Sequence, residues 1–191
     1  IELLTHYNQS ESSMKDLLRR FRKIQQLGQH NTAIVEALCL GVVRFLNTID
    51  FLIARCFSGM PLNQLHSRER NALRLAVLEV VWKDRDHEEI LKSYLSPYAP
   101  AQKALGCIDK TRLGELTHEL PLCERLSVEY AHPSFLVEVL LDQLGEASAI
   151  SLMKANNKPP VTYVRNNRLL DSGQEGIQTL CEDGISLQED H

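Results

Sequence analysis

The most restrictive feature of this sequence is an apolar pattern with the period of an α-helix, which recurs from the N-terminus to about residue 158. In the segment from Asn31 or Thr32 to about Phe57, apolar side chains return every three or four residues. Such spacing places them on one wide face of a single long helix. Because a wide apolar face must be covered by other helices, the sequence predicts a helical bundle.

Polar caps, prolines and glycines divide the pattern into separate helices. We expect a capping residue or proline at the start of each helix and glycine or proline after its end. A weakly patterned stretch from Cys107 to Pro121 is expected to hold a short helix, and Ala147 to Ala155 another. The predicted starts are Ser12 or Ser13, Ser67, Asp86 with Glu89 as a capping box, Pro121 and Pro133, and the predicted ends are Gly28, Gly59 with Pro61, and Gly145.

The pattern changes at Pro159-Pro160, because consecutive prolines require an extended backbone. The residues from Val161 to Asn166 then have the character of a first β-strand, and Ser172 is expected to cap a helix that Gly184 ends. The predicted fold class is therefore mainly α, with a helical bundle followed by the start of an α/β unit.

The composition favours a packed protein that lies outside a membrane. Hydrophobic residues make up 43% and charged residues 24% of the 191 positions. The apolar stretch from Ala33 to Cys56 contains four charged residues, more than a membrane span tolerates. The five cysteines form no C-x-x-C pair, so we expect buried free thiols in a reducing, cytoplasmic setting.

The sequence contains none of the common motifs of nucleotide binding or nucleophilic catalysis. An acidic cluster could suggest a metal site, but acids in a first helical turn complement the helix dipole, and we favour that interpretation. We expect His132, before Pro133, to act as a helix cap rather than a catalytic base. The acidic cluster comprises Asp84, Asp86, Glu88 and Glu89.

The positive signal is a row of basic residues on one predicted helix, although the net charge of the chain is -4. Lys15, Arg19, Arg22 and Lys23 share a helical face opposite the apolar stripe, and Arg20 lies beside it. A row of this kind can follow a phosphate backbone. The alternative interpretation is an ordinary solvated face.

Three segments of the chain resemble one family. Residues 36–44 and 49–53 read E-A-L-C-L-G-V-V-R and I-D-F-L-I, and residues 70–82 read R-N-A-L-R-L-A-V-L-E-V-V-W. Residues 126–137 read L-S-V-E-Y-A-H-P-S-F-L-V, followed by A-N-N-K-P-P at 155–160 and V-R-N at 164–166. These runs are similar to the NusB-like domain and the following hinge of Sun/Fmu-type (NOL/NOP/Sun) RNA cytosine-5 methyltransferases.

The resemblance implies a NusB-like RNA-binding domain at 1–130, a helical hinge at 131–160 and the truncated start of an α/β subdomain at 161–191. It implies a parent enzyme that uses S-adenosylmethionine to methylate cytosine C5 in structured ribosomal or transfer RNA. In that family the donor site and two catalytic cysteines lie further along than residue 191. We therefore expect no catalytic, cofactor-binding or metal residue in this chain.

The partners expected from the resemblance are structured RNA and the protein's own C-terminal methyltransferase domain. The candidate RNA-binding residues are Lys15, Arg19, Arg20, Arg22, Lys23, Arg165 and Arg168. Two alternatives are a stand-alone NusB-type transcription antitermination factor and a protein-interaction domain that binds no RNA. The predicted strand after Pro160 argues against the first, and an RNA-binding assay separates the second.

Overall fold

The computed structural model describes residues 1–26, 28–56, 61–95, 105, 108, 113–158, 163–165, 173–182 and 184–186. The chain is mainly α, as predicted, and it divides into two compact units, Ile1–Asn157 and Lys158–His191. No single helix in the described ranges is long and apolar enough to cross a membrane. Two consecutive helices pass the length and composition test only when taken together, and they are bent by 72°.

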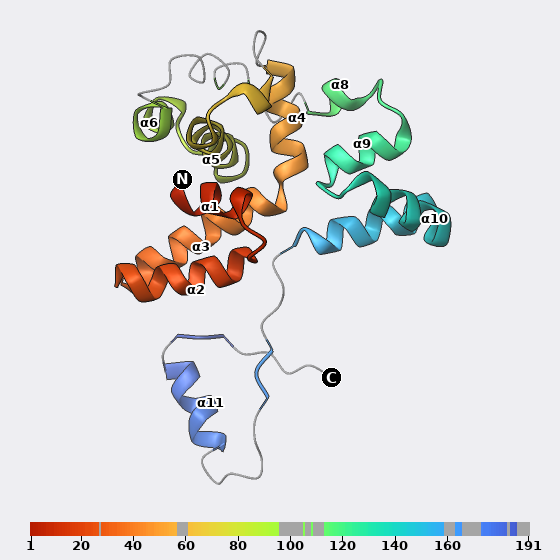
Figure 1. Ribbon diagram of the computed structural model, residues 1–191. Coiled ribbons are helices and arrows are strands. Elements are labelled where there is room, and N and C mark those ends of the chain that lie inside the picture. The colour runs from red at the N-terminus through yellow and green to blue at the C-terminus, as the bar shows by residue number, and fades with distance from the viewer. Residues whose placement is uncertain are drawn as a thin grey trace. The chain divides into compact units, whose positions relative to one another are not determined.

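The first unit begins with a helical bundle around one central helix (Figure 1). Almost every side chain from Asn71 to Val81 on this helix is buried, because other helices pack around it. Its partner helix approaches closely at Gly41, where an added Cβ would lie 2.9 Å from a methyl carbon of Leu78. The bundle helices are α1 (Glu2–Gln9), α2 (Met14–Gln25), α3 (Gln29–Arg44), α4 (Leu46–Cys56) and the central α5 (Ser67–Lys83).

The prediction of a single long helix from Asn31 or Thr32 to about Phe57 is wrong. The chain forms α3 and α4, which meet at a 72° bend where Phe45 leaves the helical conformation. The Phe45 ring stacks on Trp82 of α5 with centroids 4.6 Å apart. Both helices bury an apolar face with the same helical period. The apolar pattern of the sequence therefore continues across the bend and does not reveal its position.

Several predicted helix ends are confirmed and others are shifted. Ser13 caps α2 by accepting from the Asp16 N–H, and Asp86 caps α6 (His87–Ile90) by accepting from the Glu89 N–H. Gly28 does not end α2, which stops at Gln25; it is the N-cap of α3 instead. Ser67 is the first residue of α5, after His66 as N-cap, and Gly59 lies outside the described residues.

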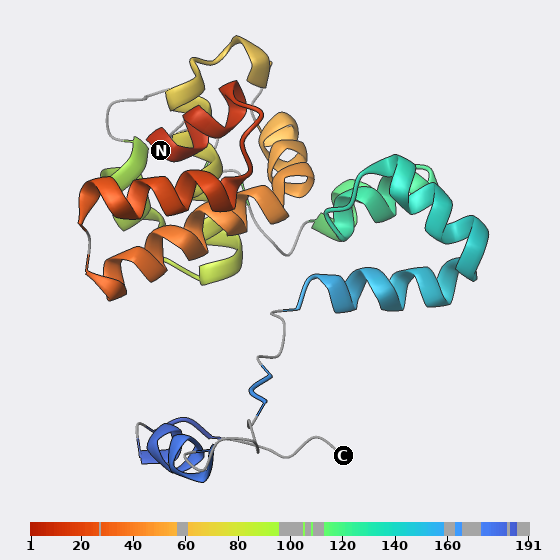
Figure 2. The same ribbon diagram turned by 60° about the horizontal axis from the view of Figure 1, so that its bottom comes forward.

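The second half of the unit has a small core of its own. Pro121 and Pro133 are N-caps, one residue before the helical positions predicted for them. Gly145 interrupts the last helix at φ 72° and ψ 166°, which confirms the predicted break and bends the helix visibly (Figure 2). The helices of this half are α8 (Leu113–Thr117), α9 (Leu122–Glu129) and α10 (Ser134–Asn156). Two short elements, η1 (Leu62–Gln64) and the π-helical turn η2 (Leu91–Leu95), belong to the bundle around α5.

The C-terminal unit contains α11 (Gly173–Glu182). Gly184 ends this helix at φ 82°, with its N–H bonded to the Cys181 carbonyl and the Ile185 N–H bonded to Leu180, as a Schellman motif requires. Residues 163–165 form no strand, and none of the backbone hydrogen bonds among the described residues involves them. The other residues of the predicted strand, Pro159-Pro160 and Ser172 lie outside the described ranges.

Candidate RNA-binding surface

Helix α2 has one apolar and one basic face. Met14 and Leu18 are buried in the bundle core, where α2 packs against α1 and α3. Ile24, although apolar, is 74% exposed near the end of the helix. All five predicted basic side chains of this helix, Lys15, Arg19, Arg20, Arg22 and Lys23, are exposed. We refer to these five residues as the basic face.

Two members of the basic face have acidic partners. Arg19 lies 3.0 Å from Asp16 on its own helix, and Arg22 lies 3.5 Å from Glu36 on α3. These pairs are exposed, and exposed pairs contribute little free energy, so an RNA phosphate can compete with the carboxylates. Within the described part of the chain, Lys15, Arg20 and Lys23 have no ion-pair partner.

The other two predicted RNA-binding residues belong to the C-terminal unit, which is described by itself. Arg165 is exposed but belongs to the C-terminal unit, which is separate from the bundle. Arg168 lies outside the described residues. The candidate surface therefore consists of the basic face on α2 with the neighbouring Glu36.

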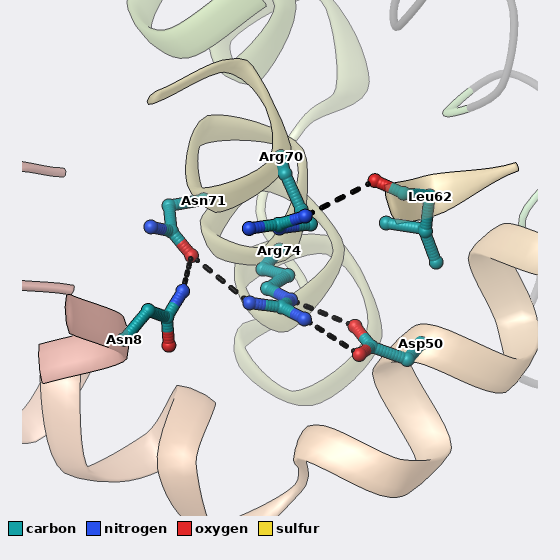
Figure 3. A network of polar contacts seen from close by, with 6 residues as sticks. All are labelled: Asn8, Asp50, Leu62, Arg70, Asn71 and Arg74. Atoms are coloured by element: carbon teal, nitrogen blue, oxygen red, sulfur yellow. Dashed lines mark hydrogen bonds and ion pairs between the residues drawn. The ribbon is translucent and has the colours of Figure 1, made fainter. Parts of the chain in front are cut away.

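The polar residues Asn71 and Arg74 of α5 bind inside the bundle and not at its surface (Figure 3). Arg74 is 8% exposed and donates to both carboxylate oxygens of Asp50 on α4, over 2.7 and 2.6 Å. It also donates to the Asn71 side-chain oxygen over 3.1 Å, which Asn8 of α1 reaches over 3.3 Å. This network joins α1, α4 and α5, so it is structural, and the periodicity of the sequence does not indicate it.

A second buried contact was also missed from the sequence. The hydroxyl of Tyr94 in η2 donates to the carboxylate of Glu79, which is only 6% exposed. Burial and this hydrogen bond to a carboxylate hold the pKa of Tyr94 well above its ordinary value. The same carboxylate lies 3.8 Å from Arg85, so the buried charge of Glu79 is compensated by a cation and a hydroxyl.

The acidic cluster is used in helix ends and ion pairs. Asp86 caps α6, and Asp84 follows α5 in the left-handed conformation. Glu88 lies 3.7 Å from Lys92, and Glu89 pairs with Arg85 instead of returning to Asp86. Among the described residues there is no group of three or more side chains that could hold a metal ion.

His132 is not a helix cap. Pro133 is the N-cap of α10, and the His132 ring is buried at the corner between α9 and α10. Its Nδ1 lies 2.6 Å from the Tyr130 carbonyl and its Nε2 lies 3.3 Å from the Asn156 amide nitrogen. Asn157 donates to the same Tyr130 carbonyl over 2.8 Å. The H-P and A-N-N motifs therefore bind one another.

Within the described ranges, no glycine-rich loop joins a strand to a helix. A glycine-rich loop between a strand and a helix is the usual cradle for such nucleotide-like ligands. The described glycines cap or interrupt helices or lie within them, and the described ranges contain no strand. Cys39, Cys123 and Cys181 are free thiols, and Cys107 lies outside the described ranges. No step of methyl transfer is assigned to these residues.

The chain thus consists of a helical bundle with a basic outer helix, followed along the sequence by a second, smaller unit. Comparison with known families gives each part a family. Residues 1–95 match the NusB family, and residues 132–191 match the ferredoxin-like domain of RsmF/B-like methyltransferases. In this order the two matches fit the N-terminal region of Sun/Fmu-type methyltransferases. Neither a curated protein nor a solved structure matches the chain.

Proposed function

We propose that this chain is the RNA-docking part of an RNA cytosine-5 methyltransferase, and that the basic face of α2 binds the RNA. The observation that supports this most directly is the exposure of all five cations of α2, three of them without an acidic partner among the described residues. The family assignment supplies the context, because NusB-type domains generally bind RNA. The parent enzyme is proposed to take its methyl group from S-adenosylmethionine and to act in the cytoplasm.

The chemistry of the basic face favours contact with the RNA backbone. Lysine and arginine side chains on one helical face neutralise phosphates and release condensed counterions, which makes binding steeply dependent on salt. Such contacts fix the position of the RNA without reading its bases, so sequence preference is expected to be slight. Structured ribosomal or transfer RNA is therefore the expected ligand class.

The test reverses the two outer lysines, Lys15→Glu with Lys23→Glu. This pair is preferred because it leaves the Arg19–Asp16 and Arg22–Glu36 ion pairs intact. Binding of a structured RNA is measured by fluorescence anisotropy over a range of salt concentrations. We expect a large loss of affinity, and a plot of log affinity against log salt that is flatter by about two units, one for each phosphate contact removed.

The matched control reverses Lys83 and Lys92, which are exposed cations at other places on the bundle. It lowers the net charge by the same amount, so it reports the effect of charge without the effect of position. An equal loss of RNA affinity in the two double variants would contradict a docking surface confined to α2. If the unaltered chain binds no structured RNA, the result would favour the alternative of a protein-interaction domain. Specific binding to one short single-stranded sequence would favour the stand-alone antitermination factor.

A further inference from the structure

Two polar side chains in the first turn of α4 bind the backbone of a corner more than seventy residues further along the chain. Asn47 donates to the carbonyl of His132 over 3.1 Å, and the Thr48 hydroxyl donates to the carbonyl of Val128. Thr48 is 1% exposed, so water has little access to its hydrogen bond. Val128 lies in the last turn of α9, and its carbonyl also accepts from the Ala131 N–H over 3.4 Å.

The corner itself is held by further hydrogen bonds, so it behaves as one piece. The Ser127 hydroxyl donates to the His132 carbonyl over 2.6 Å, and the His132 N–H donates to the Ser127 carbonyl over 3.1 Å. The ring of His132 is fixed by Tyr130 and Asn156, as described above. The hydrogen bonds from Asn47 and Thr48 therefore position the ends of both α9 and α10 that meet at this corner.

On its other side α4 is fixed to the bundle. The bend at Phe45 sets the direction of the helix, and Asp50 binds Arg74 of the central helix α5. Asn47 and Thr48 lie in the region that matches the NusB family, and His132 is the first residue of the region that matches the ferredoxin-like domain. The two bonds from α4 thus cross from one family domain toward the next.

We propose that Asn47 and Thr48, with the carbonyls of Val128 and His132, form an interdomain latch that holds the α9–α10 corner in one orientation against the NusB-like bundle. In a protein that docks RNA on α2, the latch fixes the orientation of the α9–α10 corner relative to the RNA-binding helix. That consequence rests on the proposed RNA-docking function. The fixed orientation of the corner does not.

The test measures orientation directly in the full chain. Spin labels are attached through non-canonical amino acids at Gln25 of α2 and Gln143 of α10, both exposed, which leaves the native cysteines unlabelled. The distance distribution between the labels is recorded by pulsed electron paramagnetic resonance. The unaltered chain should give one narrow distribution, and Asn47→Ala with Thr48→Val should broaden it. Amide exchange at Ala131 and His132 should rise about tenfold, as expected when a buried hydrogen bond is lost.

Two control variants distinguish the latch from general destabilisation. Thr48→Ser keeps the hydroxyl donor and should restore the narrow distribution. Thr5→Val removes a hydroxyl that bonds to Ile1 and Asn71 inside the bundle, and it should leave the distribution narrow. The RNA affinity of the latch variant should equal that of the unaltered chain, because Asn47 and Thr48 hydrogen-bond to the α9–α10 corner and are not part of the basic face.

A distribution in the double variant as narrow as in the unaltered chain would overturn the proposal. If the double variant does not fold, Asn47→Ala alone decides the question, because Asn47 is exposed and its replacement spares the core. Failure of the unaltered chain to bind RNA would remove the docking function and the role of the latch in it. The distance measurement would still decide whether the latch orients the corner.

Discussion

The side chain of Arg74 is a nearly buried cation whose charge is balanced within the bundle. Its guanidinium binds both oxygens of Asp50 and the amide oxygen of Asn71, so three helices depend on one residue. Taking a charge out of water is costly, and the cost is offset only when partners satisfy it. Removing one partner therefore does more damage than the ion pair itself contributes to stability.

We expect Arg74→Met to lower the free energy of unfolding by about 2–3 kcal/mol. Breaking a fully buried pair costs roughly 3–5 kcal/mol, and the value is smaller here because the Asp50 side chain is 33% exposed. Arg68→Met is the control, since Arg68 and Glu2 form an exposed pair 3.8 Å apart that should be worth under about 1 kcal/mol. Urea denaturation measures both, and equal losses would contradict the assigned role of Arg74.

The cysteines should differ in reactivity. Only the thiolate is nucleophilic, and burial raises the pKa of the Cys39 thiol, so less of it is ionised at a given pH. Cys181 is exposed. In folded protein treated with iodoacetamide at about pH 8, Cys181 should be alkylated first and Cys39 last. Peptide mass spectrometry over time would reveal the order, and equal rates would show that Cys39 is not enclosed in solution.

At the scale of single elements, α10 depends on one residue that permits its break. Gly145 has φ 72° and ψ 166°, a backbone conformation that side chains with a Cβ essentially never adopt. The break lets Val137 on one half and Ala149 and Met153 on the other pack into the same small core with α9. A straight helix of this length could not turn back over that core.

Gly145→Ala should therefore destabilise the chain by about 1–3 kcal/mol. Gly114→Ala is the matched control, because Gly114 is helical within α8 and an added Cβ would meet no atom within 4 Å. That change should be neutral or stabilising by up to about 1 kcal/mol. Thermal unfolding followed by circular dichroism compares them. A Gly145→Ala variant with unchanged stability would mean that α10 straightens without losing its packing.

At the scale of the whole molecule, the described structure has two apolar cores of unequal size. The larger one surrounds α5, and the smaller one lies between α9 and α10. The described side chains of α11 contribute to neither; all are exposed except the half-buried Leu180. Local stability follows buried apolar contact, so the C-terminal unit should open far more often than the bundle.

Native-state amide exchange is expected to show this difference. Amides of α5 should exchange slowest, by global unfolding, and amides from Gly176 to Cys181 of α11 should exchange quickly through local opening. The smaller core should give intermediate protection in α9 and α10. Protection in α11 equal to that in α5 would show that the C-terminal unit is supported by contacts outside the described structure.

The sequence by itself determined the features that depend on neighbouring residues. Ser13 and Asp86 cap their helices, and Gly145 and Gly184 take positive φ, because each of these interactions is made within a few positions of the chain. The cations of α2 were predicted for the same reason, since a helical period places them on one face. The resemblance to the two matched families could also be predicted, because the motifs that carry it are short runs of neighbouring residues.

Tertiary structure decided the features that join distant segments. The bend at Phe45 depends on packing against Trp82, and the partners of Arg74 and His132 come from other helices. Periodicity reports which side of a helix is buried but not what buries it, so it cannot locate such contacts. For the same reason the bonds from Asn47 and Thr48 to the α9–α10 corner were visible only once the chain was folded.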